Sequence, residues 1–474
     1  MSAILSIFWG LVLFSALVFI HEGGHYLAAR MFGVRVLEFF IGMPSKLQLS
    51  FVSRKKGTRF GVTPLLLGGY ARIAGMDLGK KLDHLASLFT LIQIKGVASL
   101  QELAGLLKIS VDSCSDHLLA LENWGSIKFV PFEEYERLCI ELADKKGISL
   151  PDLSSSFEGV ERAFQYVALN MPRDEEGKTQ FDKANLAQLD NSYLGASFRP
   201  KDMSYEEFFK QEKRRCYAGI SALPRIIILL AGIFVNIVFA LALFVALFMG
   251  HGLDMPNQTI SAVQEQSKAA QIGLEPGDTI QAIDGKTINS WSELQMALAN
   301  HKNGRDFVLS VLKANNKTLQ DYQIKLEAQE NLGVFPTVER HKLNFKDSLS
   351  MSLGYTLQTA QAVARLFSPS GFSETISQSG SVVAISVMAK DAAQSGILPF
   401  ASLAAAISLS LGFMNLLPIP PLDGGKVVIE LVQALTRRPV SEKIQVALSI
   451  AGVAFILMLF IYLTGQDIFR IISG

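Results

Sequence analysis

Two histidines four residues apart flank a glutamate at the end of the first apolar segment. The run 4–20 leads into His21, Glu22 and, after two glycines, His25. On a helix, residues four apart lie on one face, so both imidazoles can bind one zinc ion while Glu22 holds a water molecule. The alternative is the plain polar end of a membrane helix, but charged groups at membrane depth are costly and usually functional.

Two glycines stand inside this pattern. Gly23 and Gly24 each cost about 1 kcal/mol relative to alanine in a helix interior. We therefore expect either the close approach of another backbone or a local kink at this point.

A catalytic zinc ion needs a third protein ligand, which must come from elsewhere in the chain. The best candidate is Asp423, which follows three prolines within residues 418–421. These prolines break a helix, and broken backbone at membrane depth is tolerated where it is buried or lines a polar cavity. Asp423 would then lie in such a cavity, although it could instead cap the next helix, residues 424–435.

Two asparagines lie in apolar segments. Asn415 precedes the prolines and could hydrogen-bond the substrate backbone or a group next to the ligands. Asn236 follows a small pair, Ala231 and Gly232, that favours close helix packing. Asn236 either bonds a neighbouring helix or helps to hold the active site or substrate, and helix packing is the simpler interpretation.

The composition indicates a polytopic α-helical membrane protein. Of 474 residues, 49% are hydrophobic and 18% are charged, which is too apolar for an ordinary soluble protein. Spanning a bilayer takes about 20 apolar residues. Four segments meet this length: Ile4–Met31, Leu223–Met249, Pro399–Leu417 and Ile444–Thr464. The first has no basic n-region and no small-residue cleavage site, so we interpret it as a membrane span and not as a signal peptide.

Basic residues predict the orientation. They follow the first span, flank the start of the second and lie between the third and fourth: Arg30, Arg35, Arg54, Lys55, Lys56, Arg59, Lys213, Arg214, Arg215, Arg225, Arg437, Arg438 and Lys443. By the positive-inside rule these loops are cytoplasmic, so both termini and residues 251–398 face outward. The three cysteines, Cys114, Cys139 and Cys216, then lie in the cytoplasm, where disulfides are not expected.

A glycine-punctuated stretch follows the first span. Residues 58–75 alternate partly between apolar and polar positions and are too broken for a spanning helix. We predict strands, or a loop that dips into the membrane face, with an edge that could pair with an extended peptide. A surface hairpin without a role in substrate binding is the alternative.

Residues 77–211 have the composition of a soluble domain. Residues 99–110, 111–124 and 125–130 read as helix, helix and strand, which resembles a winged helix-turn-helix unit. Its predicted apolar core is Leu100, Leu103, Leu106, Leu107, Leu118 and Leu121. The second helix presents Asp112, Asp116, His117 and Glu122. Acidic groups oppose phosphate binding, so we expect a cytoplasmic protein partner and no nucleic acid.

Residues 259–339 resemble a PDZ domain. Strand-like segments surround a Gly-Leu-Glu-Pro-Gly-Asp turn at 273–278, and a helix with a capping box at Ser290 and Glu293 follows. PDZ domains bind extended peptides by strand addition. We place the semi-polar helical residues 341–398 on the membrane surface.

Six parts are expected along the chain. They are 1–76 with the first span and a membrane-associated β segment, 77–211 as the cytoplasmic winged-helix-like insert, 212–250 with the second span, 251–340 as one extracytoplasmic PDZ domain, 341–398 as the amphipathic surface region, and 399–474 with the third and fourth spans.

These features resemble the bacterial site-2 protease family, in particular its RseP-like branch. The resemblance rests on the zinc-binding pattern, the Gly68-Gly69-Tyr70 run, the small pair with Asn236, the PDZ-like unit and the Asn415 to Gly424 run. It covers most of the chain outside residues 77–211. The glycine pair, the single PDZ-like unit and the large insert depart from the family pattern.

The resemblance implies an intramembrane zinc metalloprotease with one zinc ion per chain. It implies His21, His25 and Asp423 as ligands, Glu22 as the general base and Asn415 as a residue that positions substrate. Four more residues are expected beside the substrate: Gly68, Gly69, Tyr70 and Asn236. The implied substrates are single-span membrane proteins of the anti-sigma factor type or signal-peptide remnants, and the implied location is the bacterial cytoplasmic membrane.

Two other functions fit parts of this pattern. A catalytically silent membrane-tethered adaptor would use the PDZ-like and winged-helix-like units, but it would not need Glu22 as a base. A metal transporter would use the predicted ligands as a transit site, but transit needs more than one site, and the other five of the seven histidines lie outside the predicted spans.

Overall fold

Among the residues that the structure describes, four long apolar helices can cross a membrane. They are α1 (Ser2–Met31), α8 (Ala222–Gly250), α14 (Ile397–Asn415) and α16 (Glu442–Ser473). Each contains a stretch long and apolar enough to span a bilayer. The four predicted spans are confirmed as helices, and the chain is a multi-pass membrane protein.

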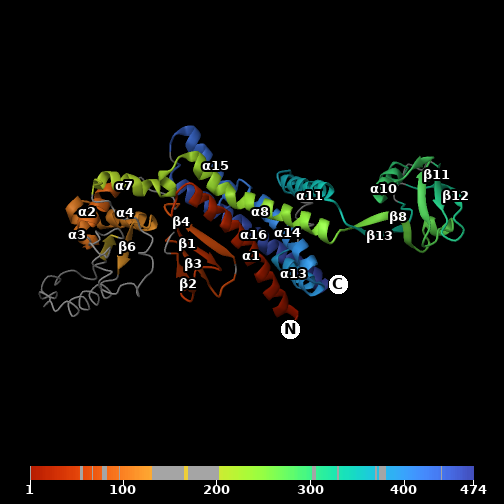
Figure 1. The fold of residues 1–474 in the computed structure, drawn as a ribbon, viewed down its shortest axis with the longest axis horizontal. Helices are drawn as coiled ribbons and strands as arrows, with labels where there is room; N and C mark the ends of the chain where they lie inside the picture. The colour runs from red at the N-terminus through yellow and green to blue at the C-terminus, as the bar shows by residue number, and fades with distance from the viewer. Residues whose placement is uncertain are drawn as a thin grey trace. The chain divides into compact units, whose positions relative to one another are not determined.

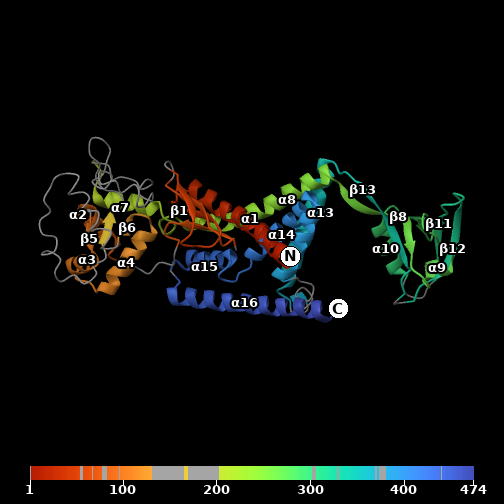
Figure 2. The same cartoon turned by 90° about the horizontal axis from the view of Figure 1, so that it is seen from below.

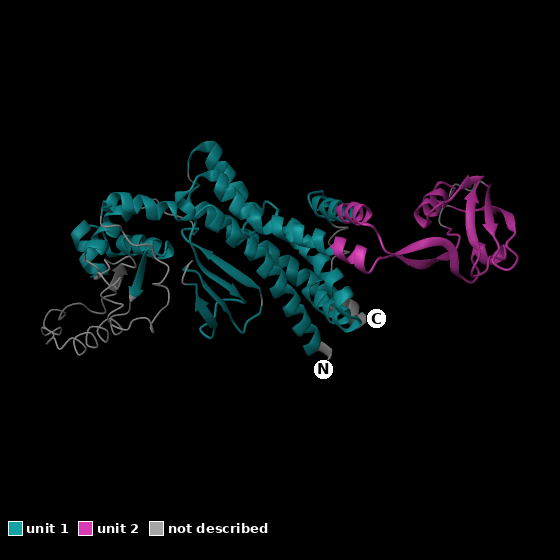
Figure 3. Cartoon of the chain, viewed as in Figure 1, with its two compact units in different colours: residues 1–243, 354–474 teal, residues 244–353 magenta. Residues whose placement is uncertain are grey.

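The computed structural model divides the chain into two compact units. Unit 1 comprises Met1–Leu243 and Gly354–Gly474, and unit 2 comprises Phe244–Leu353 (Figure 3). The structure describes residues 2–53, 57–66, 68–76, 83–95, 97–130, 165–168, 202–301, 306–327, 330–368, 371–372, 381–438 and 440–473. Cys139 and most of the second half of the predicted insert lie outside these residues.

Glycines set the distances between the helices of unit 1, in which α1 and α8 run side by side (Figure 1). A Cβ atom on Gly24 of α1 would overlap the backbone of Ala231 on α8. A Cβ atom on Gly412 of α14 would lie 3.4 Å from the backbone oxygen of Ile233 on α8. Close approach of a backbone, one of the two expected explanations, therefore applies to Gly24, whereas a Cβ on Gly23 would meet no atom within 4 Å.

A four-stranded sheet follows α1. Its strands are β1 (Val36–Ile41), β2 (Leu49–Val52), β3 (Arg59–Val62) and β4 (Gly69–Ile73). Their order is β2-β3-β1-β4, with β1 and β3 parallel and the other pairs antiparallel. Residues 58–75 thus contain strands, as predicted, but β3 and β4 lie on opposite sides of β1. The alternative of a simple hairpin in this stretch is therefore wrong, and β4 is an edge strand.

Aromatic side chains of this sheet pack against aromatic side chains of α1. The ring of Phe39 on β1 lies 4.9 Å from that of Phe19 and 5.2 Å from that of Tyr26, both on α1. Phe39 and Tyr26 are buried together with Val36 and Ile73. The sheet is therefore held beside the helical turn that carries the His-Glu-His pattern.

The insert folds into helices around a small sheet. Its described elements are α2 (Leu85–Lys95), β5 (Val97–Ser99), α3 (Leu100–Leu107), α4 (Val111–Asn123), β6 (Ile127–Val130), β7 (Gln165–Ala168), α7 (Tyr205–Arg214) and the short 3-10 helix η4 (Tyr217–Gly219). The sheet order is β5-β7-β6. Two helices and a strand thus follow one another from residue 99 to 130, as the sequence predicts.

Most of the predicted leucine core of the insert is confirmed. Leu103, Leu118 and Leu121 are fully buried, and Leu100 and Leu107 pack against them. Leu106 is 51% exposed, so its assignment to the core is wrong. His117, expected on the outer face of α4, is also buried, and its Nδ1 lies 2.6 Å from the Ser113 carbonyl oxygen one turn earlier.

Unit 2 consists mainly of a twisted antiparallel sheet. Its elements are β8 (Leu253–Val263), α9 (Lys268–Gln271), β9 (Thr279–Ile283), β10 (Lys286–Thr287), α10 (Trp291–Asn300), β11 (Asp306–Leu312), β12 (Leu319–Lys325) and β13 (Val334–His341). The strand order is β12-β11-β9-β8-β13. A buried core that includes Ile260, Leu294 and Phe307 lies between the sheet and its helices.

Three further helices complete the described chain: α11 (Phe345–Arg365), α13 (Val382–Ser395) and α15 (Asp423–Thr436). Leu13 and Leu17 of α1 are buried with Ala389 of α13, so α13 packs along a candidate span. A Cβ atom on Gly452 of α16 would overlap the backbone oxygen of Pro420. The helix α16 therefore packs closely against the proline-rich turn before α15 (Figure 2).

Candidate metal centre

The two histidines of the pattern point their Nε2 atoms at the same place. His21 and His25 are four residues apart on α1, and their Nε2 atoms are 3.2 Å apart. Their rings meet edge to face, with centroids 4.8 Å apart. Their exposed fractions are 6% and 5%, so both imidazoles are withdrawn from solvent.

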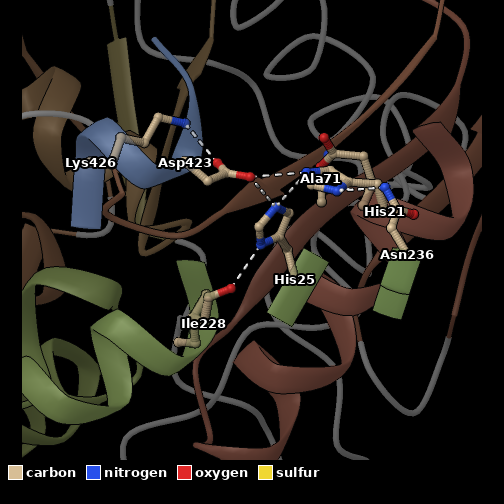
Figure 4. Close-up of polar contacts among 8 residues, drawn as sticks. His21, His25, Ala71, Ile228, Asn236, Asp423 and Lys426 are labelled. Atoms are coloured by element: carbon tan, nitrogen blue, oxygen red, sulfur yellow. Dashed lines mark hydrogen bonds and ion pairs between the residues drawn. The ribbon is translucent and has the colours of Figure 1, made fainter. Parts of the chain in front are cut away.

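Asp423 joins the histidines from the other end of the chain. Its Oδ2 lies 2.9 Å from His21 Nε2 and 3.2 Å from His25 Nε2 (Figure 4). The carboxylate belongs to the first residue of α15, whereas the N-cap of that helix is Leu422 without a side-chain cap. The alternative that Asp423 caps α15 is therefore wrong.

The donor separations suit a tetrahedral metal ion. Bonds of about 2.0–2.1 Å to nitrogen and oxygen at tetrahedral angles place donors about 3.3 Å apart. The three separations are 2.9, 3.2 and 3.2 Å. Two imidazoles and one carboxylate also leave a fourth position for water or substrate. The residues present therefore fit a catalytic zinc ion.

Gly232 of α8 leaves open space next to the Nε2 atoms of both histidines. A Cβ atom on Gly232 would lie 2.6 Å from His25 Nε2 and 2.9 Å from His21 Nε2. A larger residue would therefore occupy the space next to the two donor atoms.

The Nδ1 atoms of both imidazoles contact residues of α8. His25 Nδ1 lies 2.7 Å from the backbone oxygen of Ile228, which accepts a hydrogen bond and leaves Nε2 free to act as a ligand. His21 Nδ1 lies 3.2 Å from Nδ2 of Asn236. These contacts orient both rings toward the shared position.

Glu22 points to the sheet instead. Its Oε2 accepts a hydrogen bond of 3.0 Å from the backbone N–H of Ala71 on the edge strand β4. One of its oxygens still lies within 4.8 Å of a donor atom of each histidine. The carboxylate is thus close enough to serve the same centre and also contacts the strand edge.

The turn that carries Asp423 is tightly packed. Cβ atoms on Gly424 and Gly425 would overlap backbone atoms of Leu416 and Pro420, so only glycine fits at either position. Lys426 Nζ lies 3.6 Å from the outer oxygen of Asp423. The turn therefore fixes the position of the carboxylate, and Lys426 offsets part of its charge.

Comparison with known sequences places the whole chain in one family. The profile of Peptidase family M50 matches residues 9–459. The chain belongs to this family. The M50 peptidase is 28% identical over 466 residues to a Streptococcus pyogenes serotype M3 protein named "Putative zinc metalloprotease SPs1691", covering 97% of this chain and 98% of that protein.

Two further relatives of this M50 peptidase match over a similar length. "Zinc metalloprotease RasP" of Bacillus licheniformis is 26% identical over 470 residues. "Probable protease eep" of Enterococcus faecalis is 26% identical over 471 residues. Each match covers 97% of this chain and 98% of the relative, so the insert and unit 2 lie within the matched length.

Three of the residues expected beside the substrate of this M50 peptidase lie at the start of β4. Gly68 has φ +135° and is buried, and its carbonyl oxygen accepts a hydrogen bond of 2.7 Å from the Gly42 N–H. A Cβ atom on Gly69 would lie 2.7 Å from the backbone oxygen of Phe40. Tyr70 donates a hydrogen bond of 3.1 Å to Glu38. Burial and this carboxylate raise the pKa of Tyr70 to about 12, so the phenol keeps its proton.

The side-chain amides of Asn236 and Asn415, the other two residues expected beside the substrate of the M50 peptidase, differ in their contacts. Asn236 touches His21, so it does more than pack helices. Asn415 is the last residue of α14 and half-buried, and no residue in the described part of the chain hydrogen-bonds its side chain. The contacts that sequence reasoning missed, Ile228 and Ala71, use backbone atoms, which every residue has and no pattern distinguishes.

Proposed function

We propose that this M50 peptidase hydrolyses peptide bonds within membrane-spanning segments of other proteins, at one zinc ion held by His21, His25 and Asp423. The observation that carries the proposal is the convergence of the three donor atoms among apolar helices, with Glu22 at the same place. When bound there, zinc supplies a Lewis acid that polarises a carbonyl group and lowers the pKa of a water molecule.

Glu22 acts as the general base. A carboxylate that is not a ligand can take a proton at one oxygen and pass it to the departing amine. The contact between Glu22 Oε2 and the Ala71 N–H holds the carboxylate at the edge of β4. The base is therefore positioned by the strand to which we assign the substrate.

The substrate pairs with the edge of β4. Peptide bonds in a membrane helix are hydrogen-bonded and shielded, so the helix must unwind locally before cleavage. An added strand along β4 would replace the lost backbone hydrogen bonds where no water is available. Gly68 precedes this strand and Gly69 and Tyr70 begin it, and Asn415 would bond the substrate backbone beside the ligands. Single-span proteins of the anti-sigma factor type and signal-peptide remnants have the form that this arrangement requires.

Unit 2 limits access to the site. The strand order, the Gly-Leu-Glu-Pro-Gly-Asp turn and the helix α10 are typical of a PDZ domain. In the proposed orientation, with both termini and unit 2 outside the cytoplasm, a domain of this kind excludes substrates with bulky outer parts. It contributes no ligand to the proposed zinc site.

The insert serves a cytoplasmic protein partner. The winged-helix-like arrangement of α3, α4 and β6 carries Asp112, Asp116 and Glu122 on its second helix. A DNA reader gains most of its affinity by neutralising phosphates, and this helix would repel them.

The decisive test measures zinc content and substrate cleavage in the same variants, which distinguishes the proposed base from the proposed ligands. Purified protein should hold about one zinc ion per chain. Glu22→Gln should keep this zinc and lose cleavage of a single-span model substrate, because it removes a base and no ligand. Asp423→Ala should lose the zinc as well, whereas Lys426→Met, the matched control beside it, should retain it.

Two results would contradict the proposal. Normal turnover by Glu22→Gln would exclude the mechanism, and full zinc content in Asp423→Ala would exclude the third ligand. Metal analysis and gel-based cleavage on the same detergent-solubilised samples give both answers.

A further inference from the structure

The Asn236 side chain on α8 lies within hydrogen-bonding distance of the proposed ligand His21. It is completely buried, and its Nδ2 lies 3.2 Å from His21 Nδ1. Its other amide atom, Oδ1, is buried without a hydrogen-bond partner among the described residues. A buried unpaired carbonyl oxygen is costly and needs an explanation.

The proposed zinc site would give Oδ1 a hydrogen-bond donor. A histidine that binds metal through Nε2 carries its proton on Nδ1, which is then a donor. The Nδ2 group of Asn236 is also a donor, so the two groups cannot bond as they face each other. A half-turn of the amide places Oδ1 against Nδ1, and the two ends of an amide are nearly equal in size. The turn breaks no hydrogen bond of Oδ1, since that atom has none.

Contacts from α14 hold Asn236 at this distance. The Ser408 hydroxyl of α14 donates a hydrogen bond of 3.1 Å to the Asn236 backbone oxygen. A Cβ atom on Gly412 of α14 would lie 3.5 Å from the Asn236 Cβ. The amide therefore has a fixed backbone and can adjust only by turning.

The face of α8 toward the metal centre repeats every four residues. Ile228 offers its backbone oxygen to His25, Gly232 leaves room beside both Nε2 atoms, and Asn236 faces His21. Residues spaced by four share one side of a helix. One side of α8 thus presents a backbone acceptor to His25, a side-chain amide to His21 and a gap between them.

We propose that Asn236 is a positioning residue, whose amide oxygen accepts the Nδ1 proton of His21 and so holds that ring in the tautomer and orientation that bind zinc. This inference rests on the proposed function and adds to it the role of a residue that does not touch the metal. Partners of this kind commonly change metal affinity 10–100-fold when removed.

The test measures zinc affinity directly. In detergent-solubilised full-length protein, chelator competition should give Asn236→Leu a zinc affinity about 10–100-fold below that of the unaltered protein. Asn236→Asp should recover most of this loss, because a carboxylate oxygen also accepts the proton. Val238→Ala, on the same helix at a position 44% exposed, should bind zinc like the unaltered protein.

The readouts separate positioning from folding. The thermal midpoint of zinc-free Asn236→Leu should stay close to that of the zinc-free unaltered protein. The absorption spectrum of the cobalt-substituted protein should change in Asn236→Leu but not in Val238→Ala. If Asn236→Leu does not fold, Asn236→Asp decides: a loss of zinc affinity there would overturn the inference. Unchanged affinity in Asn236→Leu, with affinity lost in His21→Ala, would overturn the inference alone. Unchanged affinity in His21→Ala would overturn the ligand assignment and the inference together.

Discussion

Glu22 and the two histidines beside it are held by different parts of the fold. His21 and His25 rest on α8, whereas Glu22 bonds the edge strand β4. Ala71 lies 49 residues after Glu22, and Ile228 lies 203 residues after His25. One turn of α1 is thus fixed from two sides, which lets the proposed base be positioned separately from the proposed ligands.

The sequence could predict the residues whose side chains do chemistry but not the atoms that orient them. His21, Glu22 and His25 are recognisable because a spacing of four places both imidazoles on one face. Asp423 is recognisable because prolines break the helix before it. The sequence also does not identify Gly232 as a residue of the metal site. Gly232 contributes by leaving space next to the Nε2 atoms of both histidines, and this space depends on how α1 and α8 cross.

The two adjacent glycines of the pattern should respond oppositely to the same substitution. Gly24→Ala would force its Cβ into the backbone of Ala231, and we expect destabilisation of about 1–3 kcal/mol with loss of zinc. Gly23→Ala meets no atom within 4 Å, so we expect a gain of up to about 1 kcal/mol from helix propensity and an unchanged zinc content. Thermal unfolding and metal analysis of both variants test this, and equal behaviour of the pair would refute the close contact of α1 and α8.

At the scale of elements, a buried ion pair joins the insert to the sheet. Arg35, just before β1, donates two hydrogen bonds of 2.9 and 3.1 Å to Glu212 of α7. It also donates to the backbone oxygens of Trp124 and Gly125 at the end of α4. Glu212 is fully buried and accepts a further bond from Ser126. The insert is therefore fixed to the end of the sheet that contains β4.

The helices of the insert could be predicted from sequence, but this junction could not. Apolar spacing and the Ser99 and Ser110 caps indicate α3 and α4. In the sequence, Arg35 belongs to a group of basic residues after the first span, and nothing there indicates its partner Glu212, which lies 177 residues away. The strands β1 and β2 are hard to predict from sequence because β1 shows no regular alternation of apolar and polar residues and β2 spans only four residues.

Breaking this ion pair should loosen the insert. Glu212→Gln leaves Arg35 buried without its counter-charge, which typically costs about 3–5 kcal/mol. Glu206→Gln is the matched control on the same helix, because its pair with Lys210 is exposed and contributes about 0.3–0.5 kcal/mol. We expect a clear fall in thermal stability for the first variant and almost none for the second.

The thiol of Cys216 reports the same junction. Burial raises the pKa of this thiol to about 12, while Arg35 lowers it and Glu212 raises it by smaller amounts, so at pH 8 it is a protonated and unreactive thiol. Maleimide labelling of Cys216, resolved by peptide mass spectrometry, should therefore be slow in the unaltered protein and rise with pH. The labelling rate of Cys216 should increase in Glu212→Gln and stay unchanged in Glu206→Gln. Equal labelling rates in both variants would mean that the ion pair does not hold the insert.

At the scale of the whole molecule, the chemistry is confined to unit 1. His21, Glu22 and His25 come from α1, Asp423 from α15, and the acceptors that orient them from α8 before residue 244. Unit 2 begins within α8 and ends within α11, and its first and last strands pair with each other, since Leu253 lies opposite His341 in the ladder of β8 and β13. An insertion whose ends are adjacent can be removed without stretching the chain that remains.

Replacing most of unit 2 should leave the metal centre intact and change only which substrates are cleaved. Met255 and Glu339 are partners across the β8–β13 ladder, so residues 256–338 can be replaced by an Asn-Gly turn that closes a two-residue hairpin. We expect zinc content equal to that of the full-length protein, because no ligand or ligand-orienting atom is removed. Cleavage of single-span substrates with large outer domains should increase several-fold relative to substrates with short ones, measured side by side in the same detergent. Loss of zinc from a variant that still unfolds cooperatively would show that unit 2 supports the site, and an unchanged preference for short outer domains would show that it does not limit access.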